Sequence, residues 1–282
     1  MSIILNHKTL STIPNFYDRA FLLSLGIIDP SCVIELDLSN NQITEINGLD
    51  LFVNLQTLNL SNNLITEIKG LESLTKLNYL NLSYNQITRI SGLKNLTNLI
   101  ALNLFSNLVE KIELPYLNML DELILSANNI SIIENLHNVP NLRYLDLASN
   151  QIWVIQGLSE LKLLFSLNLT RNSIRKIEGL DNLSNLKILC LNYNRIRHIS
   201  NMMHLRLSEF YINNNLIENI EIEMKNVVRS YRILSHDCKT TSTTEHVLSH
   251  TMASASASTS ASTTEPVLFS YRCLLDDLIF ME

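Results

Sequence analysis

The side chains that could do chemistry are scattered along this chain of 282 residues and form no catalytic pattern. His198 and His204 lie six residues apart, a poor spacing for ligands of one metal ion. The four cysteines show neither metal-ligand nor disulfide-framework spacing. No zinc-protease, phosphate-loop or serine-hydrolase motif occurs. We therefore expect a protein that is not an enzyme and that has no catalytic residue, cofactor or metal site.

Aromatic and acidic side chains recur where a short strand would turn them away from a core. In the line L-N-Y-L-N-L that begins at Leu77, the leucines face one way, whereas Tyr79 and Asn81 face the other. Exposed aromatic residues are preferred anchors of protein interfaces. The alternative is cross-strand stacking that only stiffens a sheet. The corresponding positions give these predicted partner-binding residues: Tyr79, Tyr84, Phe105, Glu122, Tyr144, Asp146, Tyr193 and Tyr211. We expect Tyr79, Tyr84, Phe105 and Tyr144 to form one cluster.

A charge gradient forms a second candidate site, along the turns that follow these strands. Early turns carry Glu45 and Glu67. Later turns carry basic residues instead. Such a basic edge could steer an acidic partner towards the later turns. The alternative is a solvated rim, because any exposed turn needs polar residues. The later, basic residues are Arg171, Arg175, Lys176, Arg195, Arg197 and His198.

A tandem repeat positions all of these residues. Its line is L-x-x-L-x-L-x-x-N-x-I-x-x-I-x-G-L-x-x-L-x-x, as in Leu55–Lys76 and Leu77–Asn98. A fixed period of this kind predicts a leucine-rich repeat solenoid of the α/β class. We expect a right-handed coil, with a curved parallel β-sheet on the concave face and short helical or irregular segments on the convex face. Nine asparagines mark the repeats: Asn41, Asn63, Asn85, Asn107, Asn128, Asn150, Asn172, Asn194 and Asn215.

Two residue types make the repeat physically specific. An asparagine amide carries donors and an acceptor, so a buried one can bond the backbone of its own repeat and of the next. Glycine recurs at one position, where Asn135 and Asn201 stand in two repeats, which indicates a positive φ. The fourth repeat, at Ile112–Pro115, lacks this glycine, and we expect an irregular outer turn there. The glycines are Gly48, Gly70, Gly92, Gly157 and Gly179.

Composition divides the chain into four parts. We assign residues 1–32 as an N-terminal cap, with a helix over Pro14–Leu25 that Asn15 caps. Residues 33–222 hold nine repeats, and residues 223–238 are a C-terminal cap candidate. Residues 239–282 are a Ser/Thr/Ala-rich, low-complexity tail.

The overall charge and the apolar runs exclude several partners. The net charge of -6 without a basic block argues against nucleic acid. The chain has no apolar run that spans a bilayer and shows no basic-led leader. We therefore expect a monomer that binds another protein, located in the cytoplasm and also in the nucleus.

The repeat line closely resembles the 22-residue leucine-rich repeat class typified by the nuclear regulatory subunit of protein phosphatase 1. That resemblance implies binding of a phosphatase catalytic subunit through acidic and aromatic residues of the concave face. The matching positions here are Phe105, Glu122, Tyr144, Asp146 and Tyr211. The family's C-terminal cap matches only at Tyr231–Leu234, and the array is shorter. Bacterial internalins, which are surface adhesion proteins, and dynein-associated or cytoskeletal repeat proteins use similar lines.

Overall fold

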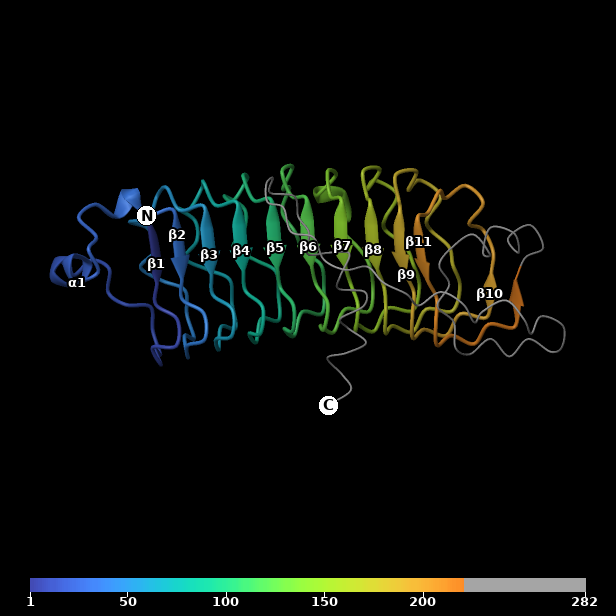
Figure 1. Cartoon of the computed structure of the whole chain (residues 1–282), viewed down its shortest axis with the longest axis horizontal. Helices are drawn as coiled ribbons and strands as arrows, with labels where there is room; N and C mark the ends of the chain where they lie inside the picture. The colour runs from blue at the N-terminus through green and yellow to red at the C-terminus, as the bar shows by residue number, and fades with distance from the viewer. Residues whose placement is uncertain (221–282) are drawn as a thin grey trace, which may run out of the picture.

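The computed structural model describes residues 1–220, and these form one curved array of parallel strands (Figure 1). Each strand pairs in parallel with the strand of the next coil, in the order β1-β2-β3-β4-β5-β6-β7-β8-β9-β11. A second, two-stranded sheet pairs β10 (His198–Ile199) with β12 (Asn219–Ile220). The ten strands of the main sheet are Ser2–Ile4 (β1), Glu35–Asp37 (β2), Thr57–Asn59 (β3), Tyr79–Asn81 (β4), Ala101–Asn103 (β5), Glu122–Ile124 (β6), Tyr144–Asp146 (β7), Ser166–Asn168 (β8), Ile188–Cys190 (β9) and Glu209–Tyr211 (β11).

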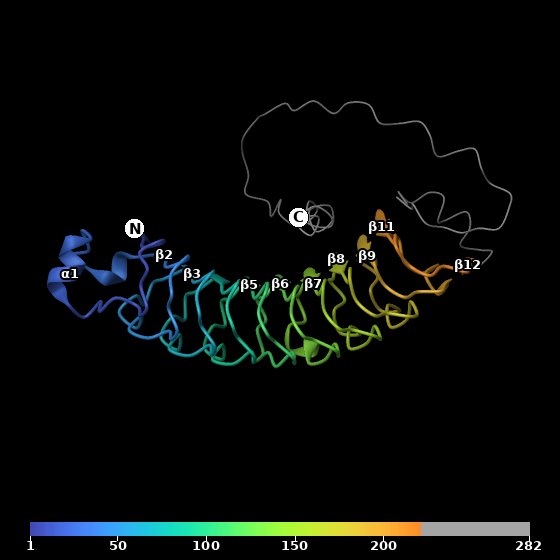
Figure 2. The same cartoon turned by 90° about the horizontal axis from the view of Figure 1, so that it is seen from below.

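The strands line the inner side of an arc, and the rest of each coil forms its outer side (Figure 2). The predicted solenoid is therefore confirmed. We number the positions of each repeat from the first leucine of the line, so that Leu77 is position 1 of the third repeat. The residues at positions 1, 4, 6, 11, 14, 17 and 20 fill a continuous core. In the third repeat these are Leu77, Leu80, Leu82, Ile87, Ile90, Leu93 and Leu96, and each is at most 2% exposed. Period-two spacing thus buries the strand leucines and leaves positions 3, 5, 7 and 8 on the concave face.

The asparagine at position 9 joins neighbouring coils, as predicted. Asn85 Nδ2 donates to the carbonyl oxygens of Leu82 and, in the preceding coil, Leu60, both at 3.0 Å. Its Oδ1 accepts from the backbone N–H of Ile65 at 2.9 Å. The same pattern recurs along the array, for example at Asn63 and Asn172. No aliphatic side chain could satisfy these buried backbone groups.

A left-handed backbone occurs at two positions of most coils. The glycine position has φ between 67° and 73° at its five glycines, and Asn135 and Asn201 have φ of 60° and 59°. The prediction of positive φ there is confirmed. Position 8 is also left-handed, although it holds no glycine, with φ from 52° to 56°. The residues at position 8 are Asn40, Asn62, Tyr84, Ser106, Ala127, Ser149, Arg171, Tyr193 and Asn214.

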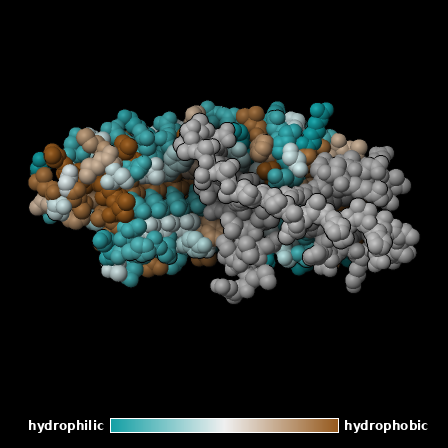
Figure 3. Space-filling view, in the orientation of Figure 1, coloured by the Kyte–Doolittle hydropathy of each residue, from teal (hydrophilic) through white to brown (hydrophobic). Residues whose placement is uncertain are grey.

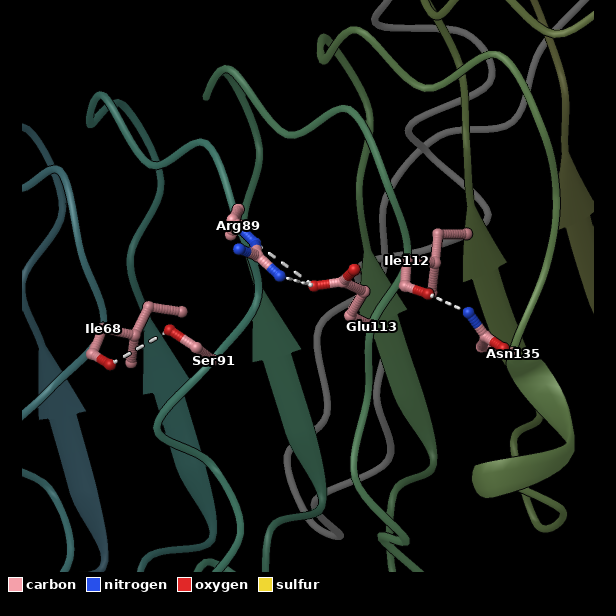
Figure 4. A network of polar contacts seen from close by, with 6 residues as sticks. All are labelled: Ile68, Arg89, Ser91, Ile112, Glu113 and Asn135. Carbon is pink, nitrogen blue, oxygen red and sulfur yellow. Dashed lines mark hydrogen bonds and ion pairs between the residues drawn. The ribbon is translucent and has the colours of Figure 1, made fainter.

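The predicted irregularity of the fourth repeat is present on the outer surface (Figure 4). In the next coil Asn135 stands at the glycine position, and its Nδ2 donates to Ile112 O of the fourth repeat at 2.8 Å. Beside it, Arg89 forms an ion pair of 2.9 Å with Glu113. A cavity of about 350 Å³ lies between these coils, lined by Gly92, Glu113, Asn135 and neighbouring residues. The missing residue therefore changes the outer turn and leaves the sheet regular.

The N-terminal residues extend the solenoid by one more coil. Strand β1 pairs with β2, and Asn41 Oδ1 accepts from the N–H groups of Lys8 and Leu10 at 3.0 and 3.1 Å. The helix of this region, α1 (Arg19–Ser24), is shorter than predicted. Asp18, and not Asn15, caps it, because the Asp18 carboxylate accepts from Ala20 N and Phe21 N. The 3-10 turns η1 (Pro30–Cys32) and η2 (Leu136–Asn138) complete the helical elements of residues 1–220. The predicted C-terminal cap and tail lie outside the described residues.

Candidate functional site

The concave face of the sheet carries the predicted partner-binding residues, on adjacent strands about 4.8 Å apart. Tyr79 and Tyr84 are the most open of them, with about half of each residue exposed. Tyr79 in β4 is paired in register with the smaller residues Thr57 in β3 and Ala101 in β5. Its ring therefore stands above its neighbours instead of packing into a row of large side chains. Such an isolated, exposed ring on a rigid strand is suited to insertion into a partner.

The aromatic residues form two pairs and not the single cluster that we expected. Tyr84 meets Phe105 edge-on, with ring centroids 5.0 Å apart. Tyr144 contacts Phe165, with ring centroids 5.9 Å apart, and the Arg143 guanidinium lies over the Tyr144 ring at 5.5 Å. The expectation fails because adjacent strands place rings in contact, whereas Tyr84 and Tyr144 are separated by the coils of β5 and β6.

Four further predicted residues occupy more enclosed positions than Tyr79 and Tyr84. Tyr193 is 37% exposed, and the Arg171 guanidinium lies 4.4 Å from its ring centroid. Asp146 is buried, accepts from Ala148 N and Ser126 Oγ at 3.0 Å, and so fixes its own turn. Tyr211 is buried as well, and its hydroxyl donates to Glu209 at 2.8 Å. Glu122 is half-buried at the same position of β6 as Tyr144 in β7.

Polar side chains between the aromatic pairs present hydrogen-bonding groups to the concave side. At position 5, Asn59, Asn81 and Asn103 accept from the N–H two residues on, at 3.1, 3.0 and 2.9 Å. Their Oδ1 atoms are thus used, and within residues 1–220 no acceptor meets their Nδ2 groups. Groups of this kind favour a ligand with carbonyl or carboxylate oxygens.

The backbone of Tyr84 gives a test of the two interpretations of this face. A left-handed φ of 54° costs a tyrosine about 1 kcal/mol, whereas asparagine tolerates it, as at Asn62. Tyr84→Asn should relieve that strain and lose an aromatic pair worth about 1 kcal/mol. We expect the free energy of unfolding, measured by urea titration, to change by less than about 1 kcal/mol. A loss above about 2 kcal/mol would show that Tyr84 serves mainly to stiffen the sheet.

Two exposed aromatic residues were not identified from the sequence as candidates for partner binding. Phe165, at position 2 of its repeat, is 38% exposed beside Tyr144. Trp153 is 58% exposed in the turn after β7, where other repeats have Thr44, Thr66 or Thr88. The signal that could have found Trp153 is its uniqueness, because it is the one tryptophan of the sequence.

One charged pair lies at position 2, beside the strands β6 and β7. Arg143, at position 2, is bound by both oxygens of Asp121 in the preceding coil, and this hydrogen bonding raises the pKa of the guanidinium. Within residues 1–220, no group of His, Cys, Asp and Glu residues could hold a metal ion. No helix in that part of the chain is long and apolar enough to cross a membrane.

The repeats also match a known sequence family. A family profile of leucine-rich repeats, with two copies per match, fits residues 33–73, 53–95 and 75–116. These units are leucine-rich repeats. No curated protein sequence matches the chain significantly.

Solved leucine-rich repeat structures share the fold. An internalin of Listeria monocytogenes is 22% identical over 74% of this chain and 75% of its own, with a TM-score of 0.58. Internalin C2 of the same organism is 27% identical over 69% of this chain and 76% of its own, at 0.53. A leucine-rich repeat protein of Leptospira interrogans is 25% identical over 82% of this chain and 64% of its own, at 0.63. These likenesses support the fold.

Proposed function

We propose that the leucine-rich repeats form a non-enzymatic scaffold that binds another protein on the concave face, with Tyr79 and Tyr84 as its anchors. The observation that carries this proposal is the exposure of both rings on a sheet whose backbone is fixed by the asparagine ladder. A rigid strand loses little conformational entropy on binding, so more of the contact energy of each ring appears as affinity.

The polar groups around these rings indicate how a partner is held. The Nδ2 groups of Asn59, Asn81 and Asn103 form a row of donors across β3, β4 and β5. Adjacent donors about 4.8 Å apart suit the carbonyl and carboxylate oxygens of a partner surface. Aromatic anchors surrounded by hydrogen-bonding groups are the usual composition of a protein interface. This mode of binding requires no cofactor and no covalent step.

For the partner, we propose a protein phosphatase catalytic subunit, with the chain monomeric by itself and located in the cytoplasm or nucleus. The support is the resemblance of the repeat line to the phosphatase regulator class. A second candidate is adhesion to a protein at a cell surface, as for an internalin. The 27% identity to internalin C2 over most of the array favours that candidate. Both candidate functions use the concave face, so the same variants test whether that face is the binding surface. Binding assays with different partner proteins test which of the two candidate functions is right.

The double variant Tyr79→Ala with Tyr84→Ala tests the surface. We expect its affinity for purified phosphatase catalytic subunit, measured by calorimetric titration, to fall at least about 30-fold, because two anchor residues are lost. Tyr116, which is 62% exposed on the outer surface, gives the control Tyr116→Ala, expected to bind as the unchanged protein does.

Two results would count against the proposal in different ways. If the double variant binds with unchanged affinity and its far-ultraviolet circular dichroism spectrum shows that it is still folded, the concave face is not the interface. No binding of the catalytic subunit by the unchanged chain would remove the phosphatase, and affinity purification with mass spectrometry would then sort intracellular from cell-surface partners.

A further inference from the structure

A second exposed surface runs along the turns that follow the strands, apart from the concave face. In these turns, positions 11 and 14 are buried core residues, such as Ile152 and Ile155, so the two residues between them project outwards. Equivalent residues of successive coils lie side by side, as the parallel pairs Arg89 with Lys111 and His198 with Asn219 show. Positions 12 and 13 therefore form a continuous double row along one edge of the solenoid.

This edge changes character along its length. Its first part is acidic, with Glu45 and Glu67. A mixed stretch with Arg89, Glu110 and Lys111 follows. The next stretch is apolar, with Ile132 at 43% and Trp153 at 58% exposure. Its last part is basic, at positions 12 and 13 of the turn after β8 and at positions 10, 12 and 13 of the turn after β9. The exposed basic residues of these turns are Arg175, Lys176, Arg195, Arg197 and His198.

The basic part carries charge that its own surroundings do not neutralise. Other charges next to or on the edge are paired: Lys69 lies 3.6 Å from Glu45, and Arg89 binds Glu113 (Figure 4), although Lys111 forms no ion pair within residues 1–220. Arg197 binds Glu218 at 2.6 Å. By contrast, Arg175, Lys176 and Arg195 form no ion pair with any acidic residue of the described chain. We call the five residues Ile132, Trp153, Arg175, Lys176 and Arg195 the Trp153 edge.

A solvated rim does not account for this combination. A turn that only needs polar residues is served by threonine or serine, as at Thr66 and Ser131. An exposed tryptophan beside unpaired arginines instead has the composition of a binding hot spot. The apolar residues supply contact area, and the adjacent cations select a partner of negative charge.

We infer that the Trp153 edge docks an acidic peptide segment of a partner protein, one that carries an apolar side chain for Trp153 and carboxylates for the basic residues. The edge spans about four coils, roughly 15 Å, which an extended run of about five residues covers. The acidic part of the same edge disfavours an anionic bilayer as the occupant. Glu67 lies five coils, about 24 Å, from Arg175, so a flat bilayer along the edge would meet both charges, whereas a short peptide need not.

This site is independent of the concave face, so its occupation does not depend on the proposed function. Positions 12 and 13 point outwards from the turn, whereas Tyr79 and Tyr84 lie on the strand side. A partner could therefore use both surfaces at once, and the second contact would then be intramolecular and raise the total affinity.

The single tryptophan of the chain makes a direct experiment possible. Trp153 fluorescence of the full chain is titrated with a synthetic peptide of glutamates around a central Phe-Leu, at low ionic strength. We expect a blue shift with saturation, because the peptide removes the indole from water, and weaker binding as salt rises. Two control peptides, one with lysine in place of glutamate and one with serine in place of Phe-Leu, should bind at least about tenfold more weakly. Vesicles of phosphatidylcholine and phosphatidylserine test the bilayer.

Matched variants test which basic residues bind the acidic peptide. The double variant Arg175→Gln with Lys176→Gln should bind the acidic peptide at least about tenfold more weakly, as measured by Trp153 fluorescence. Arg89→Gln removes a cation from position 13 that is already paired with Glu113, and should leave the titration unchanged. No spectral change with the acidic peptide, equal losses in both variants, or a shift with vesicles alone would each overturn the inference. Loss of phosphatase binding in the double variant Tyr79→Ala with Tyr84→Ala concerns the concave face and does not bear on this inference.

Discussion

Asn85→Leu is expected to lower the free energy of unfolding by about 3 kcal/mol, although the two side chains are similar in size. The N–H of Ile65 would lose its acceptor, Asn85 Oδ1, inside the core. A buried donor without a partner costs about 1–3 kcal/mol, and the lost carbonyl bonds add to this. The carbonyls are less affected, since Leu60 O also accepts from Asn63 and Leu82 O also accepts from Asn107.

That sharing predicts a second, sharper result. In the double variant Asn63→Leu with Asn85→Leu, Leu60 O loses both of its donors. The cost of the double change should therefore exceed the sum of the single costs by about 1 kcal/mol or more, as expected for residues in one network. Asn63→Leu with Asn172→Leu, five coils apart, should be additive to within about 0.5 kcal/mol.

Urea unfolding followed by circular dichroism measures these values. Asn98→Leu is the matched control, because Asn98 lies in the same repeat, is exposed, and donates one bond of 2.7 Å to Thr75 O. It should cost less than about 1 kcal/mol. Equal costs for Asn85→Leu and Asn98→Leu would show that the buried amide does not join the coils in solution.

The sequence was sufficient for the fold because each coil repeats the same physical requirements. Leucines at alternating positions, an asparagine that must be buried and a glycine that must be left-handed all recur with one period, so they define the core, the ladder and the turn together. The irregular fourth repeat was predictable for the same reason, since a missing residue at the glycine position interrupts a fixed period.

The candidate site was less predictable, because side-chain contacts between coils depend on geometry that the period does not encode. The repeat line placed Tyr79 and Tyr84 on the concave face, but it could not show that Asp146 fixes its own turn or that Tyr211 is buried. Nor could it show that Tyr144 pairs with Phe165, because position 2 is not part of the alternating pattern. The left-handed backbone of Tyr84 was hidden too, since no glycine marks position 8.

Gly92→Ala is expected to destabilise the protein by about 2–3 kcal/mol more than Gly48→Ala, although both glycines have nearly the same φ, 69° and 67°. A methyl group at Gly92 would lie 2.1 Å from Ile68 O, in the backbone of the preceding coil. At Gly48 it would meet nothing within 4 Å. The strain of a left-handed alanine, about 1–2 kcal/mol, is therefore common to both variants, and their difference isolates the contact between coils.

The same measurement decides what limits the spacing of the coils. Backbone atoms cannot yield as a flexible side chain can, so the solenoid must open locally around Gly92 to admit the methyl group. Asn135 and Asn201 show that an asparagine side chain can occupy this position, and the Asn135 amide donates to Ile112 O at 2.8 Å. If Gly92→Ala and Gly48→Ala cost the same, left-handed φ alone explains the glycine, and the coils are held apart by their side chains. If Gly92→Ala costs more, the backbone contact sets the spacing, and with it the separation of the concave-face tyrosines that a partner must fit.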